Sequence, residues 1–101
     1  MNLEIINNVG TFEIHGDFTG ANTDIVESYF NKLLDTYYEV VLCLKQVQQI
    51  DSNALKVLQF ITAKAKRRSK VLFVLGKENA IVFQELKKAN LTKIFKNDYD
   101  C

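Results

Sequence analysis

The sequence predicts an α/β fold in which helices pack against a small mixed β-sheet. Two short, continuously apolar segments, Val40 to Leu44 and Val71 to Leu75, are typical of strands buried on both faces. Between them, an amphipathic helix is expected from about Ser52 to Arg68. This order forms a strand–helix–strand unit of suitable length for a crossover between parallel strands. The alternation of strands and helices excludes a helical bundle or a β-sandwich.

The N-terminal part predicts an antiparallel contribution to that sheet. Leu3 to Asn8 and Thr11 to His15 are strand candidates, and Gly10 between them can take the positive φ of a tight turn. We expect a loop over Gly16 to Gly20. Apolar residues then recur at helical spacing from Ile25 to Tyr37, which predicts an amphipathic helix.

We expect a third helix from about Asn79 to Ala89, with Ile81 among its inward residues. Asn90 suits the left-handed conformation that ends many helices. Leu91 to Phe95 is a candidate for a last short strand, followed by a polar tail. In the helix faces, Phe30 and Tyr37 are expected in the core, whereas Lys64 is expected on the outer face of its helix.

Composition bounds the class of protein. The 101 residues fit one domain spanning residues 1–101, and 48% apolar content suits a packed core. The formal net charge is +1, without a basic stripe of the kind that nucleic acid needs. The densest basic group is interpreted as the solvated end of a helix: Lys64, Lys66, Arg67, Arg68 and Lys70. Without a basic stripe, direct nucleic-acid binding is not expected. No apolar run approaches the roughly 20 residues of a membrane helix, so membrane insertion is not expected either.

The two cysteines predict a reducing, cytoplasmic setting. Cys43 lies in an apolar run and should be buried, whereas Cys101 is the last residue and should be exposed, which makes them poor disulfide partners. Met1 to Glu4 has neither the basic start nor the apolar stretch of a signal peptide. The sequence contains no metal-ligand spacing and no glycine-rich phosphate loop, so no cofactor is expected.

The candidate site is the turn Asp51-Ser52-Asn53-Ala54, which follows a buried strand and opens a helix. Open α/β sheets place their sites at such strand ends. Either Asp51 or Ser52 can cap the helix, which is the simplest interpretation. A phosphate on Ser52 would lie at the positive end of the helix and would add negative charge beside Asp51. Phosphorylation could therefore leave the helix intact while changing what docks there.

We do not expect an enzyme. The only histidine is His15, and a triad of Ser52, His15 and an aspartate is conceivable. Ser52 lacks the Gly-x-Ser-x-Gly elbow that exposes a hydrolase nucleophile. His15 is better interpreted as a solvent-facing strand residue.

The turn and its surroundings resemble the STAS domains, in particular the anti-sigma factor antagonists of bacteria. Their central signature is an apolar strand, then Asp-Ser-x-Gly-Leu, then a helix, and Val40 to Leu44 and Ile50 to Leu55 are similar to it. The resemblance covers nearly the whole chain. Gly16 to Thr19 falls at the family's first loop, Val71 to Gly76 at its next strand, and Leu91 to Phe95 at its Gly-Leu-x-x-Ile/Leu-Phe ending.

The resemblance implies a phospho-regulated protein-binding module. Its partner would be an anti-sigma factor that is itself an ATP-dependent serine kinase, and Ser52 would be the phosphoacceptor. Asp51 would shape the loop. The expected partner-binding residues are Asp17, Thr19, Asp51, Asn53, Ala54, Leu55 and Lys56.

Three positions depart from the family's pattern. Ala54 replaces the usual glycine, Thr19 the usual aspartate of the first loop, and Cys43 the usual Asp or Asn of the central strand. An alternative within the same family is an accessory subunit bound to the ATPase of a phospholipid ABC transporter, or a part of a stress-signalling assembly. Many relatives carry another helix after the position of Phe95, so the corresponding face is expected to be either open or covered by a second subunit in a homodimer.

Overall fold

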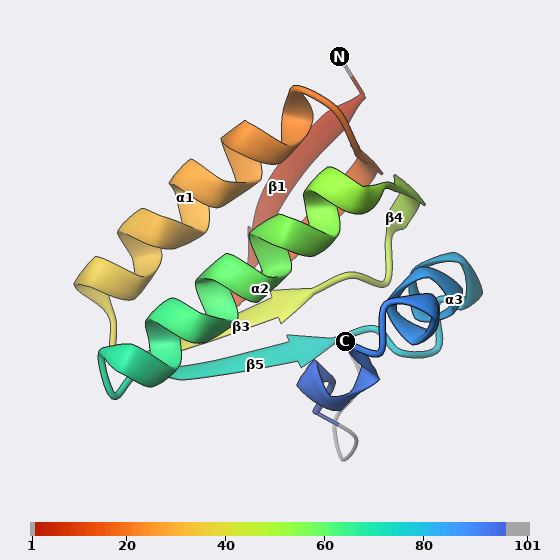
Figure 1. Cartoon of the computed structure of the whole chain (residues 1–101). Coiled ribbons are helices and arrows are strands. Elements are labelled where there is room, and N and C mark those ends of the chain that lie inside the picture. The colour runs from red at the N-terminus through yellow and green to blue at the C-terminus, as the bar shows by residue number, and fades with distance from the viewer. Residues whose placement is uncertain (1, 97–101) are drawn as a thin grey trace.

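The computed structural model describes residues 2–96 (Figure 1). The strands are β1 (Leu3–Asn8), β2 (Thr11–Phe18), β3 (Glu39–Cys43), β4 (Val47–Ile50) and β5 (Val71–Leu75). The helices are α1 (Asn22–Thr36), α2 (Ser52–Arg67) and α3 (Ala80–Lys88), followed by a short 3₁₀ helix, η1 (Thr92–Ile94).

The strands form a mixed sheet in the order β1-β2-β3-β5. β1 and β2 pair in an antiparallel hairpin, whereas β3 is parallel to both β2 and β5. Gly10 has φ +89° in the hairpin turn, as expected from its position. The predicted α/β fold with a small mixed sheet and packed helices is therefore confirmed.

The second strand is longer than expected, and the predicted loop from Gly16 begins inside it. Gly16 and Phe18 pair in parallel with Val47 and Ile50 of β4, a strand that the polar sequence before Asp51 did not reveal. The register shifts between Gly16 and Asp17, which is a bulge. Gly16 has φ +100°, and a Cβ there would lie 2.1 Å from the Asn2 carbonyl oxygen, so only glycine fits.

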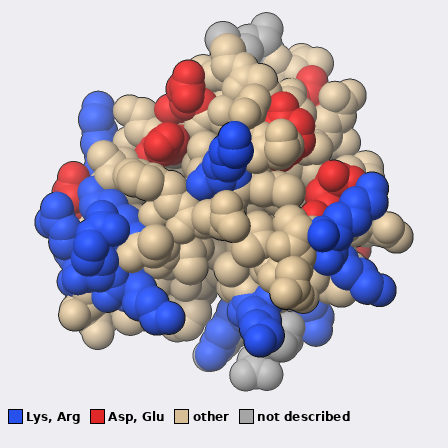
Figure 2. Space-filling view, in the orientation of Figure 1, with Lys and Arg blue, Asp and Glu red and all other residues tan. Residues whose placement is uncertain are grey.

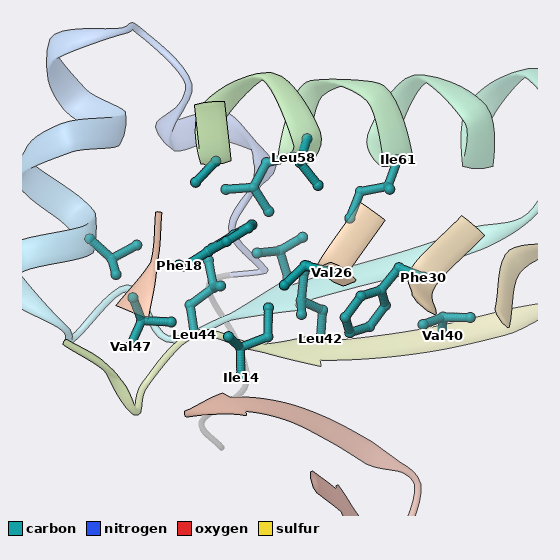
Figure 3. Packing of buried hydrophobic residues seen from close by; sticks show 14 of the residues in the cluster. Ile14, Phe18, Val26, Phe30, Val40, Leu42, Leu44, Val47, Leu58 and Ile61 are labelled. Atoms are coloured by element: carbon teal, nitrogen blue, oxygen red, sulfur yellow. The ribbon is translucent and has the colours of Figure 1, made fainter. Parts of the chain in front are cut away.

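Two crossover helices cover one face of the sheet. α1 leads from β2 to β3 and α2 leads from β4 to β5, and the helices lie side by side (Figure 1). The core lies between them and the strands, where Phe18, Phe30 and Leu58 are fully buried (Figure 3). Full burial of one such side chain contributes about 1.5–3 kcal/mol. This layer therefore fixes where the ends of α1 and α2 stand relative to the sheet.

Three side chains lie on other faces than expected. Tyr37 is 53% exposed because α1 ends at Thr36 and the backbone of Tyr37 is extended. Ile81 is 52% exposed because the buried stripe of α3 is formed by Val82 and Leu86, which were also expected inward. Lys64 is buried because its ammonium group reaches polar atoms of α1. Helical spacing alone does not specify how far the buried stripe extends around each helix.

The segment after α3 is helical where a strand was expected. Asn90 has φ +59°, the predicted left-handed conformation. Residues 92–94 form η1, and Phe95 makes only a single bridge with Val74. Three residues in a tight helical turn leave too little extended chain for a strand. The expected polar tail from residue 97 onward lies outside the described residues.

Cys43 corrects the expectation about the cysteines. Its side chain is buried, as predicted, but the residue is disulfide-bonded. Burial of a cysteine does not prevent a disulfide, which requires only that the two sulfur atoms approach in suitable geometry. The other cysteine, Cys101, lies outside the described residues. The argument from a free, buried thiol to a reducing compartment therefore does not hold.

Candidate functional site

The turn at Asp51 connects the end of β4 to the start of α2. β4 ends at Ile50, which pairs with Phe18, and α2 begins at Ser52. Asp51 is the N-cap: its backbone is extended, and its Oδ1 accepts a hydrogen bond from the Ala54 backbone N–H at 3.1 Å. Of the two residues that could cap this helix, it is the aspartate that does so. The cap satisfies one of the N–H groups that a helix start leaves unpaired.

The same carboxylate also holds the loop before α1. Its Oδ2 accepts a hydrogen bond from the Gly20 backbone N–H at 2.9 Å. Gly20 in turn accepts hydrogen bonds at its carbonyl from the backbone N–H and the hydroxyl of Thr23. Asp51 therefore joins the starts of α1 and α2 through one side chain. The sequence showed the cap but not Gly20, which lies 31 residues earlier.

Asp17, near the end of β2, and Thr19, in the loop after it, lie on the α1 side of this junction. The carbonyl of Asp17 accepts a hydrogen bond from the Asn22 side chain at 2.9 Å, and the carbonyl of Thr19 accepts one from the Asn22 backbone N–H at 3.0 Å. Asn22 is itself buried at the start of α1. The structure thus brings the predicted first-loop residues to the side of the site that Gly20 connects to Asp51.

Ser52 is the first residue of α2 and is exposed. Its hydroxyl makes no hydrogen bond to any of residues 2–96 that the structure describes. The neighbouring Asn53 is exposed as well. Ser52 lies at the N-terminal end of α2, where the helix dipole favours an anion. The geometry therefore leaves an accessible hydroxyl at a position that tolerates negative charge.

The remaining predicted site residues differ in exposure. Lys56 is exposed one turn beyond Ser52, and Leu55 is partly buried against the core. Ala54 is fully buried, so its methyl group packs inside the molecule. Ala54 can influence a partner only through the shape of the helix start.

A groove runs beside the site between the first turns of α1 and α2. Its α1 wall carries the acids Asp24 and Glu27, and its α2 wall carries Lys56 and the half-exposed ring of Phe60. Figure 2 shows acidic side chains gathered over this upper part of the molecule. The sequence analysis missed Phe60, whose helical spacing from Lys56 is the only signal that links it to the site.

Asn79 holds the chain segment that leads into β4 and the site. Its side-chain N–H₂ donates to the carbonyls of Leu44, Lys45 and Val47, at 3.0, 3.1 and 2.8 Å. Its Oδ1 accepts from the first N–H groups of α3 and so caps that helix. One amide therefore anchors the chain between β3 and β4, which positions β4 and the turn after it. The sequence marked Asn79 only as the beginning of a helix.

His15 belongs to a different surface. Its Nε2 lies 2.8 Å from Glu13 Oε1, and none of the hydrogen bonds within residues 2–96 joins it to Ser52. The pKa of Glu13 is held below its usual value, first by a hydrogen bond from the Asn8 side chain and then by one from His15.

Within residues 2–96, no group of three His, Cys, Asp or Glu side chains could hold a metal ion. The helices of this part of the chain are all too short or too polar to cross a membrane.

The STAS domain family model matches residues 1–100, so the chain belongs to the STAS domain family. No curated protein matched the chain in the comparison made. STAS domains are in general non-catalytic modules of protein interaction and regulation. The start of α2 is therefore a candidate docking surface.

Proposed function

We propose that this protein is an anti-sigma factor antagonist. In its unmodified form it binds an ATP-dependent anti-sigma serine kinase, and phosphorylation of Ser52 ends that interaction. The observation that carries the proposal is the state of Ser52, which is exposed and makes no hydrogen bond to the rest of residues 2–96, while Asp51 caps α2. A hydroxyl without a structural role can be modified without loss of the fold.

The helix start accommodates the phosphate. A phosphoserine carries about −1.5 to −2 charges, and the positive end of a helix favours an anion. Lys56 lies four residues further along α2, a spacing at which opposite charges face each other. Both effects offset the repulsion from Asp51. We therefore expect the phosphorylated protein to keep α2 intact.

The same charge would change docking. Ser52, Asn53 and Lys56 form one exposed edge, and Asp51 ties this edge to Gly20 in the loop before α1. A partner that covers both helix starts would have to desolvate the phosphate together with Asp51. Burying uncompensated charge is costly, so binding should weaken. The proposed docking surface includes the loop at Asp17 and Thr19.

The proposal places the module in the cytoplasm of a bacterium, where ATP supports the kinase reaction. It also treats residues 1–101 as one functional domain that works without a cofactor.

The test is phosphorylation by a purified anti-sigma serine kinase, chosen as one whose gene lies beside the gene for this protein. The protein is incubated with that kinase and ATP, and the product is mapped by mass spectrometry. We expect one phosphate, on Ser52, in the wild type and in Ser28→Ala, whose serine lies exposed on α1. Ser52→Ala should accept none, and Ser52→Asp should bind the kinase at least tenfold more weakly.

A phosphate on another residue, or unchanged kinase binding by Ser52→Asp, would contradict the proposal. Copurification with an ABC-transporter ATPase instead of a kinase would favour the accessory-subunit alternative.

A further inference from the structure

The end of α2 forms a second surface, remote from Ser52. Helix α2 spans 16 residues, so Arg67 lies about 22 Å along the axis from Ser52. Lys66, Arg67 and Arg68 are exposed there, and Lys70 is partly exposed. Figure 2 shows this concentration of basic side chains at the lower left, over the ends of α1 and α2.

Nearby acids do not neutralise these cations. Asp35, on α1, forms an ion pair with the buried Lys64 at 2.7 Å, so its charge mainly offsets that of Lys64 and attracts Arg68 and Lys70 more weakly. The ion pairs among residues 2–96 involve none of Lys66, Arg67 and Arg68. Glu39 is the next acid, paired with Val71 in the sheet, and a single carboxylate does not cancel four cations. The structure thus divides the basic cluster into one buried structural lysine and an exposed positive group.

Two tyrosines lie against this group. Tyr37 is 53% exposed and Tyr38 is 68% exposed, in the loop between α1 and β3. The carbonyl of Tyr37 accepts a hydrogen bond from Lys70 Nζ at 3.2 Å, and the carbonyl of Tyr38 accepts one from the Val71 backbone N–H at 2.8 Å. The fold therefore places the backbone of these two exposed tyrosines beside Lys70 and Val71, which are about 30 residues away in sequence.

We propose that this basic–tyrosine end, formed by Tyr37, Tyr38, Lys66, Arg67, Arg68 and Lys70, binds an anionic lipid surface. Each Lys or Arg near such a surface strengthens binding about fivefold. Tyrosine suits the boundary between headgroups and acyl chains because its ring is apolar and its hydroxyl is polar. The last turn of α2 and the two loops beside it form a small contact area and not the long stripe that nucleic acid needs.

End-on contact would leave the other end of α2 free. Ser52, the first residue of α2, would lie at the end of the helix away from the lipid and stay accessible to a partner (Figure 1). The lipid contact and the phosphorylation switch therefore use separate residues, and each can fail without the other.

The test is co-sedimentation of the full chain with vesicles of phosphatidylcholine containing 0, 20 or 40% phosphatidylglycerol. At low salt we expect binding that rises with the anionic fraction and is lost in 0.5 M NaCl. The triple variant Lys66→Gln, Arg67→Gln, Arg68→Gln should bind at least tenfold more weakly. A matched control, Lys87→Gln, Lys88→Gln, Lys93→Gln, removes three exposed cations at α3 and η1 and should bind within twofold of the wild type.

A second measurement tests the tyrosines. The chain has no tryptophan, so Tyr38→Trp supplies a single probe. Its emission should shift to the blue and be quenched by brominated lipid. Three results would each overturn the proposal. They are an equal loss of vesicle binding in both triple variants, no binding to vesicles with 40% phosphatidylglycerol, and tighter binding to a 20-nucleotide DNA than to vesicles. Circular dichroism of each variant checks that the fold is retained.

Discussion

Helix α2 is tied to α1 at both of its ends, but by opposite kinds of contact. At its start, the carboxylate of Asp51 accepts a hydrogen bond from the Gly20 backbone N–H near the surface. Towards its end, the ammonium group of Lys64 is buried and bonds to Asn31 and to Asp35. Each contact depends on one charged side chain in the segment that connects β4 to β5: Asp51 at the start of α2 and Lys64 towards its end.

The difference lies in how each contact responds to a nearby charge. A buried ammonium that loses its partners is costly to leave in the interior. The Asp51 carboxylate lies close to water and is only weakly held. A negative charge added beside it repels it directly. The start of α2 is thus suited to regulation, while the Lys64 contact keeps the helix pair together.

The largest effect should come from Lys64→Met. Methionine keeps most of the apolar stem but removes the donor that Asn31 and Asp35 share. We expect a loss of about 2 kcal/mol in the free energy of unfolding, measured by urea denaturation. Lys66→Met, at an exposed position of the same helix, is the control and should change stability by less than about 0.5 kcal/mol. Equal effects of the two substitutions would show that the buried contact is not an anchor.

Asp51→Ala should have an intermediate effect. It removes the N-cap of α2 and the hydrogen bond to Gly20, and loss of such a cap costs about 1 kcal/mol. The Gly20 amide should exchange its hydrogen faster in the variant, as measured by NMR. Asp51→Asn keeps one side-chain oxygen and should lose less stability. Unchanged exchange at Gly20 would mean that the junction between the helix starts is not formed in solution.

Asp35→Asn should show the pH dependence of the Lys64 contact. The hydrogen bond from Lys64 holds the pKa of Asp35 below its usual value in the folded protein. The folded state therefore binds this proton less tightly than the unfolded state does. The stabilisation is complete above the unfolded pKa, near pH 4, and is lost as the pH falls through the lower folded pKa.

We accordingly expect the variant to be less stable than the wild type at pH 7, with a gap that closes below about pH 4. Urea denaturation between pH 2.5 and 7 measures the gap. Asp24→Asn, on the exposed face of the same helix and outside the described ion pairs, is the control. A gap that persists at low pH would exclude the carboxylate charge as its cause.

The parts of the fold that the sequence predicted are those that depend on local apolar pattern. The runs at Val40 and Val71 marked the parallel strands, and Gly10 marked the hairpin turn. β4 was missed because its four residues are half polar and gain their pairing only from the bulged end of β2. Strand pairing of this kind depends on residues far away in the sequence, so the apolar pattern of a short segment cannot predict it.

The site was predicted in its position but not in its contacts. Asp51 and Ser52 have the same capping chemistry, so the sequence could not decide which residue caps and which stays exposed. The backbone conformation of the turn decides it: Asp51 is extended and reaches the Ala54 N–H. Likewise, Lys64 was expected at a solvated helix end, but in the structure its ammonium group lies 2.7 Å from the Asp35 carboxylate. Such distinctions need the three-dimensional neighbours of each side chain.

The smallest effect on stability is expected from Ser52→Ala. The Ser52 hydroxyl makes no hydrogen bond to the described residues, and alanine favours a helix by up to about 0.5 kcal/mol over serine. The free energy of unfolding should therefore stay the same or rise by that amount. A loss above about 1 kcal/mol would show that the hydroxyl helps to cap α2 in solution. Ser52 would then be part of the fold, and its phosphorylation would disturb the helix start that Asp51 otherwise holds alone.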